Sequence, residues 1–243
     1  MLYTGVALAG AMDNEMIRLE AYVIPMDDFQ VPTYESFGEK LGDLGQKIIV
    51  GIQNFIEKCI AFIEKFMLTI RSFKKIQVPK DIEAAYFSIY TSLNRLVIDI
   101  NQAIMSDNDD KVADTYKPML TTIQNKKEYI LLMNANPSTY NDEDYIELSK
   151  DTTKNIITLM KNTRDILTKT KNTLRAYNKG TTTFTNERSM SYQVLELACT
   201  SFMMISNRII YFGRASKYDN GSIQLDREVE VEVDPMGKKR KGK

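Results

Sequence analysis

The chain has 243 residues, of which 43% are hydrophobic and 26% charged, and its formal net charge at pH 7 is zero. This composition is typical of a globular protein and excludes a largely disordered chain, and the length is enough for one large or two modest cores. The absence of histidine removes the commonest general base and the commonest metal ligand from any site that the chain could form.

Charge is concentrated at the two ends of the chain. Residues 1–45 contain eight acidic and two basic side chains, whereas the last six residues read KKRKGK. Such an asymmetry is typical of interacting tails rather than of catalytic segments. We therefore expect an acidic, partly extended leader at 1–35, a helical bundle at 36–215, and a tail at 216–243 that is first acidic and then basic.

The first predicted helix covers residues 37–73. Its apolar positions recur every 3.6 residues on average, which is the period of a straight α-helix rather than of a supercoiled seam. The stretch FIEKCIAFIEKF at 55–66 lies in its middle, and isoleucines beside the main stripe widen the apolar face. A broad apolar face is typical of a helix embedded in a bundle. We expect Phe55, Phe62 and Phe66 to be buried.

Four more helices are predicted, at about 79–105, 109–133, 142–178 and 186–215. Pro118 predicts a kink or a late start in the third helix. The predicted inner face of the fifth helix consists of Met190, Val194, Leu197, Met204, Ile205, Ile209 and Phe212. EVEVEVD at 228–234 alternates with period two, as in a lone edge strand or an extended acidic tail. The predicted fold is all-α, a bundle of about five helices with a short extended C-terminal tail.

Enzyme signatures are missing from the sequence. It contains no glycine-rich phosphate loop, no G-x-S-x-G and no cysteine cluster. Adjacent carboxylates such as Asp27–Asp28 and Asp109–Asp110 fall in predicted loops and helix caps, and DNDDK at 107–111 lacks the spacing and the glycine of a calcium loop. We expect no catalytic residue, no metal site and no cofactor.

The two cysteines, Cys59 and Cys199, both lie in apolar stretches. We interpret them as small buried hydrophobic side chains rather than as nucleophiles or a disulfide. So few cysteines indicate an intracellular setting, or a particle assembled in a cytosol.

The fourth predicted helix carries a basic stripe. Seven cations fall within an arc of about 100° on one side of it. They are Lys150, Lys154, Lys161, Arg164, Lys171, Arg175 and Lys179. Lys238, Lys239 and Arg240 add positive charge in the C-terminal tail. This stripe is either a solvated outer face or a contact for phosphate backbones and other anions. It contains no aromatic residue to stack on bases, so we expect no sequence-specific recognition.

The order of these features resembles that of the internal head, prohead-core and ejected proteins of large tailed bacteriophages. The resemblance is carried by residues 13–75, an acidic leader with Pro25 and Pro32 followed by IQNFIEKCIAFIEKFMLTIRSFKK. It implies a virion protein, often with a leader that a protease removes after a glutamate. Here RLE before Ala21 and TYE before Ser36 depart from that cleavage pattern.

The first hypothesis is thus a non-enzymatic virion protein, internal to the head or near the portal, assembled in the host cytoplasm. Its partners would be other virion proteins and DNA bound without sequence specificity, and a homo-oligomer is left open. The alternative is a membrane-active or secreted effector whose first helix leaves the bundle to contact lipid. Because acids balance the lysines on the polar face of that helix, core packing is favoured over membrane contact.

Overall fold

The computed structural model describes residues 16–26, 41–106, 112–178 and 185–217. Within these ranges the chain is mostly helical, with six α-helices and one small antiparallel sheet. The expected helical architecture is therefore confirmed in its main feature, whereas the sheet was not predicted. The leader before residue 16 and the tail after residue 217, including EVEVEVD and KKRKGK, lie outside the described residues.

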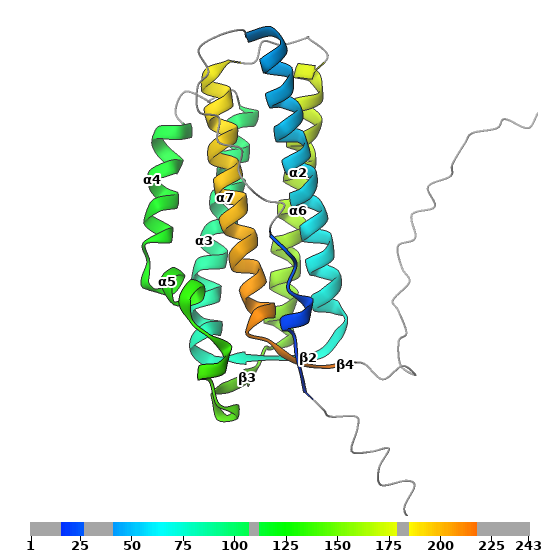
Figure 1. Cartoon of the computed structure of the whole chain (residues 1–243), viewed down its shortest axis with the longest axis vertical. Helices are drawn as coiled ribbons and strands as arrows, with labels where there is room; N and C mark the ends of the chain where they lie inside the picture. The colour runs from blue at the N-terminus through cyan, green and yellow to red at the C-terminus, as the bar shows by residue number, and fades with distance from the viewer. Residues whose placement is uncertain (1–15, 27–40, 107–111, 179–184, 218–243) are drawn as a thin grey trace, which may run out of the picture.

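Four long helices form the body of the molecule (Figure 1). They are α2 (Leu41–Arg71), α3 (Lys80–Met105), α6 (Lys150–Asn178) and α7 (Asn186–Tyr211). α2 and α7 run in one direction, and α3 and α6 in the other. Two shorter helices, α4 (Val112–Gln124) and α5 (Lys127–Asn134), pack on α3 and α7.

The sheet closes one end of this bundle (Figure 1). Its strands are β1 (Ile17–Arg18), β2 (Phe73–Pro79), β3 (Tyr145–Glu147) and β4 (Arg214–Lys217), in the order β1-β4-β2-β3. Ile76 pairs with Ala215 and Val78 with Ile146. The side chains of Ile76, Val78 and Ala215 are buried, so the sheet covers the apolar ends of the helices.

The predicted burial of the first long helix is confirmed. Phe55, Phe62 and Phe66 are at most 4% exposed, and the rings of Phe62 and Phe66 stack with centroids 6.1 Å apart. Each aromatic ring removed from water in this way contributes about 2–3 kcal/mol. The wide apolar face of α2 is thus part of the core and is covered by its neighbours α6 and α7.

The predicted third helix is two helices. Pro118 lies inside α4, and the break occurs instead at Asn125 and Lys126. Lys126 takes extended backbone angles, φ −67° and ψ 142°, and these angles end one helix and redirect the chain into the next. A late start at Pro118 is therefore excluded, and the break after Gln124 was not predicted.

The predicted boundaries of the fourth and fifth helices also change. The 3-10 helix Asp142–Asp144 and strand β3 occupy the expected start of α6, because Tyr145–Glu147 pairs with β2. At the far end, the residues after Tyr211 turn at Gly213 and enter β4.

The predicted inner face of α7 was partly wrong, because Met190 and Leu197 are 48% and 38% exposed. α7 packs against α2, α3, α4, α5 and the 3-10 helix Glu20–Tyr22, so it is buried on most sides. Buried residues outside the predicted face include Tyr192, Leu195, Cys199, Phe202 and Met203.

Candidate functional site

A ladder of buried polar contacts holds α6 against α3. The amide Nδ2 of Asn94 donates to Thr163 Oγ1 at 2.5 Å, and Thr170 Oγ1 donates to Asn101 Oδ1 at 2.5 Å. The two asparagines are seven residues apart on α3, and the two threonines are seven residues apart on α6. Both pairs therefore lie on one seam between the helices. Because buried polar groups must find partners, this seam fixes the rotation of α6 about its axis. The opposite face of α6 is thereby turned toward solvent.

The outward face of α6 is strongly basic. Lys150, Lys154, Lys161, Lys169 and Arg175 are exposed. No carboxylate of the described residues forms an ion pair with any of these five cations. At 1.5 Å per residue they extend along about 38 Å of helix. Asp151 and Asp165 are the two acids exposed on the same helix, so positive charge dominates along its length.

Lys169 was not among the residues predicted from the sequence. It lies about 100° around the helix from Lys150, about 60° outside the predicted arc. Its neighbours in the chain, Thr168 and Thr170, gave no indication of which side of α6 would be buried. In the structure Thr170 is buried and Lys169 is exposed.

Two of the predicted contact residues are already engaged in ion pairs. Lys171 Nζ lies 2.7 Å from Glu57 Oε1, which links α6 to α2. Arg164 Nη2 lies 2.8 Å from Asp165 Oδ1 on the same helix. Each of these cations has its charge locally compensated and is only partly exposed. The other predicted contact residues, Lys179, Lys238, Lys239 and Arg240, lie outside the described residues.

A second polar cluster lies inside the bundle, between α2 and α7. Glu196 is 1% exposed, and neither of its carboxylate oxygens has a hydrogen-bond partner among the described residues. Burial raises the pKa of Glu196 to about 8, because water no longer stabilises the charged form. Sequence reasoning missed this residue, although an acid inside the apolar run VLELAC was a usable signal.

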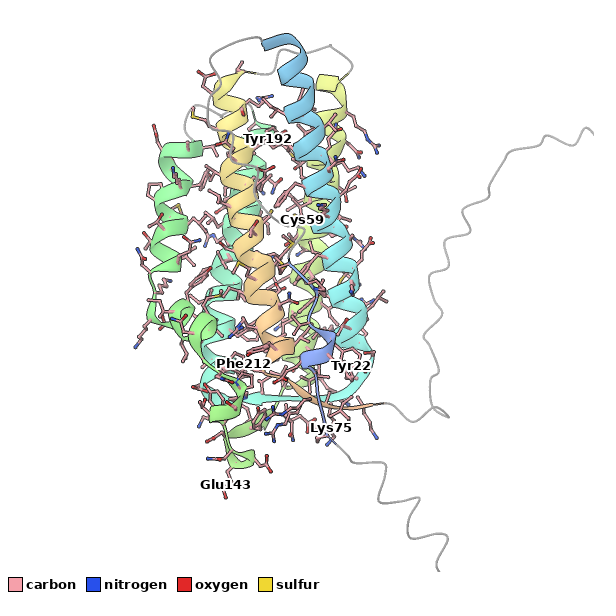
Figure 2. All side chains as sticks on the ribbon, viewed as in Figure 1. Tyr22, Cys59, Lys75, Glu143, Tyr192 and Phe212 are labelled. Carbon is pink, nitrogen blue, oxygen red and sulfur yellow. The ribbon has the colours of Figure 1, made fainter. Side chains whose placement is uncertain are left out.

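Cys59 and Cys199 meet beside Glu196. Both cysteines are free thiols and each is 1% exposed, as the sequence predicted for buried small side chains. Burial raises the pKa of the Cys59 thiol, and the nearby Cys199 side chain and the charge of Glu196 raise it further. Figure 2 labels Cys59 between the ribbons of α2 and α7.

The described part of the chain contains no group of three or more His, Cys, Asp or Glu side chains that could hold a metal ion. The exposed cations of α6 make its outward face attractive to anions.

Comparison with protein-family models, with characterised proteins and with solved structures found no match. Among the helices of the described ranges, none combines the length and the apolar character that crossing a membrane requires.

Proposed function

We propose that the protein is a non-enzymatic structural protein of a tailed-phage virion, internal to the head or near the portal, which binds DNA without sequence specificity through α6. The observation that carries the DNA contact is the row of five exposed cations without carboxylate partners on one face of a helix. The virion assignment is supported by the resemblance of residues 13–75.

DNA is favoured among anions by the shape of this face. Four of the cations, Lys150, Lys154, Lys161 and Arg175, fall within an arc of about 60° along about 38 Å of helix, which is comparable to the length of one turn of B-DNA. DNA bound along this line would release counterions from its phosphates, and that release favours binding. Asn155 and Asn162, which follow Lys154 and Lys161 in the chain, are exposed, and their amides can donate to phosphate oxygens. No aromatic side chain lies on the outward face of α6 between Lys150 and Arg175, which favours backbone contact over base reading.

The membrane alternative requires a rearrangement. The phenylalanines of α2 that would insert into lipid are buried against the other helices. Lipid contact through them would need α2 to leave the bundle and expose the core. No observation on the described residues favours that step, so the DNA proposal stands first.

The test compares two variants with the same change in net charge. In the first, Lys150, Lys154, Lys161 and Lys169 are changed to Gln. In the control, Lys65, Lys117, Lys126 and Lys127 are changed to Gln; these are exposed lysines of α2 and of the α4–α5 region. Binding to a duplex of about 30 base pairs is measured by fluorescence anisotropy between about 50 and 200 mM salt.

We expect the α6 variant to bind at least about tenfold more weakly at low salt, with the slope of log K against log salt reduced by about 3–4. The control variant should change affinity by less than about threefold, because only general charge is altered. Equal losses in both variants, or a wild-type protein that does not bind DNA at low salt, would refute the proposal.

A further inference from the structure

One side of α7 stays open to solvent although its side chains are largely apolar. Five residues spaced by three or four positions lie on this side, so they form a continuous strip along the helix. We call the strip the outer face of α7; it consists of Met190, Gln193, Leu197, Thr200 and Met204. Met190 and Leu197 are 48% and 38% exposed, and the other three residues are half-buried. The neighbours of α7 among the described elements, which include α2 and α4 (Figure 1), leave this strip uncovered.

The chain already reaches one end of this face. Asn207 lies three residues after Met204 and about 60° around the helix from it, at the border of the outer face. The carboxamide of Asn207 binds both backbone polar groups of Ile24. The 3-10 helix Glu20–Tyr22 also packs on α7. A segment that precedes α2 is therefore held against α7 near the sheet, and the next described residue after Met26 is the first residue of α2.

The positions of its two ends define the route of this connection. α2 and α7 run in the same direction and both end at the sheet (Figure 1). At 1.5 Å per residue, Asn207 lies about 6 Å from the sheet end of α7, whereas Leu41 lies about 45 Å from the sheet end of α2. The chain from Ile24 to Leu41 must therefore cover about 39 Å along the bundle, and its about 17 residues reach about 60 Å when fully extended. The direct route between these two points follows the outer face of α7.

The sequence of the connection is suited to this route. Residues 27–40, which lie outside the described ranges, read DDFQVPTYESFGEK and contain four acids and one base. Phe29 and Val31 alternate with polar residues, so in an extended chain both side chains point to the same side. Pro32 favours extended backbone at Val31. The segment thus combines an apolar side with net negative charge.

The rim of the outer face that α2 provides is basic. Glu57 pairs with Lys171 of α6 and so marks the α6 side of α2. Lys58 and Lys65 lie about 100° and 80° around the helix from Glu57, across its outward side, and are therefore on the flank toward α7. Both lysines are exposed. Their charge complements the acids that surround Phe29 in the sequence.

We propose that the outer face of α7 is the docking surface for residues 27–40 of the same chain, which bind along it in extended form. An extended residue advances about 3.3 Å and a helical residue about 1.5 Å. The five residues from Ile24 to Phe29 therefore cover the same distance as the ten from Asn207 back to Leu197, so Phe29 packs on Leu197. This contact is independent of the DNA contact proposed for α6.

A single tryptophan can report on the contact, because the chain contains none. Phe29→Trp keeps an aromatic ring at the contact, and tryptophan emission moves to shorter wavelength when the ring is removed from water. In the full chain we expect blue-shifted emission and protection from acrylamide quenching, both independent of protein concentration. Unfolding in urea should abolish both properties.

Two surface variants locate the contact on the bundle. Leu197→Gln changes the outer face, and Leu68→Gln is the matched control, because Leu68 is a 67% exposed leucine of α2. In the Phe29→Trp background, Leu197→Gln should move the emission toward that of the unfolded chain, and Leu68→Gln should leave it unchanged. In the otherwise unchanged chain, Leu197→Gln should lower Tm by about 2–5 °C through loss of apolar burial, whereas Leu68→Gln should change Tm by less than about 2 °C.

Three outcomes would overturn the proposal. Emission of the folded Phe29→Trp protein that matches the urea-unfolded chain would mean that the segment is not docked. A blue shift that fades on dilution would assign the outer face to a second copy of the chain. Equal effects of Leu197→Gln and Leu68→Gln on emission or on Tm would place the segment elsewhere. The comparison of Tm needs no tryptophan, so it decides the question even if Phe29→Trp fails to fold.

Discussion

Asn207 on α7 binds both backbone polar groups of Ile24. Its Nδ2 donates to the Ile24 carbonyl oxygen at 2.8 Å, and its Oδ1 accepts from the Ile24 N–H at 3.2 Å. Asn207 is 5% exposed, as is Ile24. The carboxamide thus takes the place of a neighbouring strand and fastens residues 16–26 to the bundle.

Replacing Asn207 by Ala should therefore loosen this segment. The change leaves a buried N–H and a buried carbonyl of Ile24 without partners, at a cost of about 2–4 kcal/mol in the free energy of unfolding. Urea unfolding measures the loss, and hydrogen exchange should show faster exchange at residues 17–24. Asn162→Ala, at an exposed site of α6, is the control and should change stability by less than about 0.5 kcal/mol.

The pair formed by Asn101 and Thr170 should show strong energetic coupling. Thr170→Val leaves the Asn101 carboxamide oxygen without its donor, so we expect a loss of about 1–2 kcal/mol. Adding Asn101→Leu removes the orphaned group. The double variant should then be more stable than the sum of the two single changes implies, by about 1 kcal/mol or more. Strictly additive losses in a double-mutant cycle would contradict this description of the α3–α6 seam.

Glu196 should make the protein less stable as pH rises. The pKa of this carboxyl is raised to about 8 in the folded state from an ordinary value of 4.5. Between these values the folded protein holds a proton that the unfolded chain has released. This group therefore lowers the free energy of unfolding by about 1.4 kcal/mol per pH unit from about pH 4.5 to 8, and adds no further change above that range.

Glu196→Gln tests this dependence because an amide stays neutral at every pH in the range. Near pH 5 the variant and the wild type should be similarly stable. At pH 8 the variant should be more stable by several kcal/mol, as measured by urea unfolding at each pH. If the difference between the two proteins is the same at pH 5 and pH 8, Glu196 is not buried as described.

Gly213 is expected to tolerate no larger residue. A Cβ at this position would lie 2.8 Å from the Ile209 carbonyl oxygen and 2.9 Å from Leu19 Cδ1. The backbone oxygen cannot move without disturbing the end of α7, so Gly213→Ala should cost about 2 kcal/mol or more. Thermal unfolding measures this cost. An unchanged Tm would mean that the β1–β4 corner can shift freely.

Lys171 should contribute to the α2–α6 contact rather than to DNA binding. Its side chain is 21% exposed and pairs with Glu57. Lys171→Gln should lower stability by about 0.5–1 kcal/mol and change DNA affinity by less than about twofold. Lys161→Gln is the comparison, because Lys161 is exposed on the same helix; it should weaken DNA binding and leave stability unchanged. The reverse pattern would assign Lys171 to the binding surface.

The long elements could be predicted because periodicity over many residues is a strong signal. The 3.6-residue period of apolar residues predicted the α2 helix and the burial of its phenylalanines. Pro79 predicted the start of α3, which begins at Lys80. The sheet had no such signal, since β1 has two residues and β3 three. Strands this short form only because they pair with residues distant in sequence, as Ile17 does with Ala215.

The candidate sites depended even more on tertiary contacts. The positions of the cations on α6 could be predicted from their spacing in the sequence. The ion pair between Lys171 and Glu57 could not, because it depends on how α2 and α6 align. The meeting of Cys59 with Cys199 likewise requires the packing of α7 on α2. The face of α7 was ambiguous for a related reason, because a helix surrounded by neighbours is apolar on most sides and its sequence no longer marks an inside.

The closing sheet has a consequence for synthesis of the chain on the ribosome. Its order places β4, the last strand to emerge, between β1 and β2, which emerge much earlier. The β1 strand has no partner until β4 leaves the exit tunnel, and β2 has one open edge during the same interval. Nascent chains that stall before residue 214 would therefore expose an apolar bundle end, which makes them expected clients of chaperones.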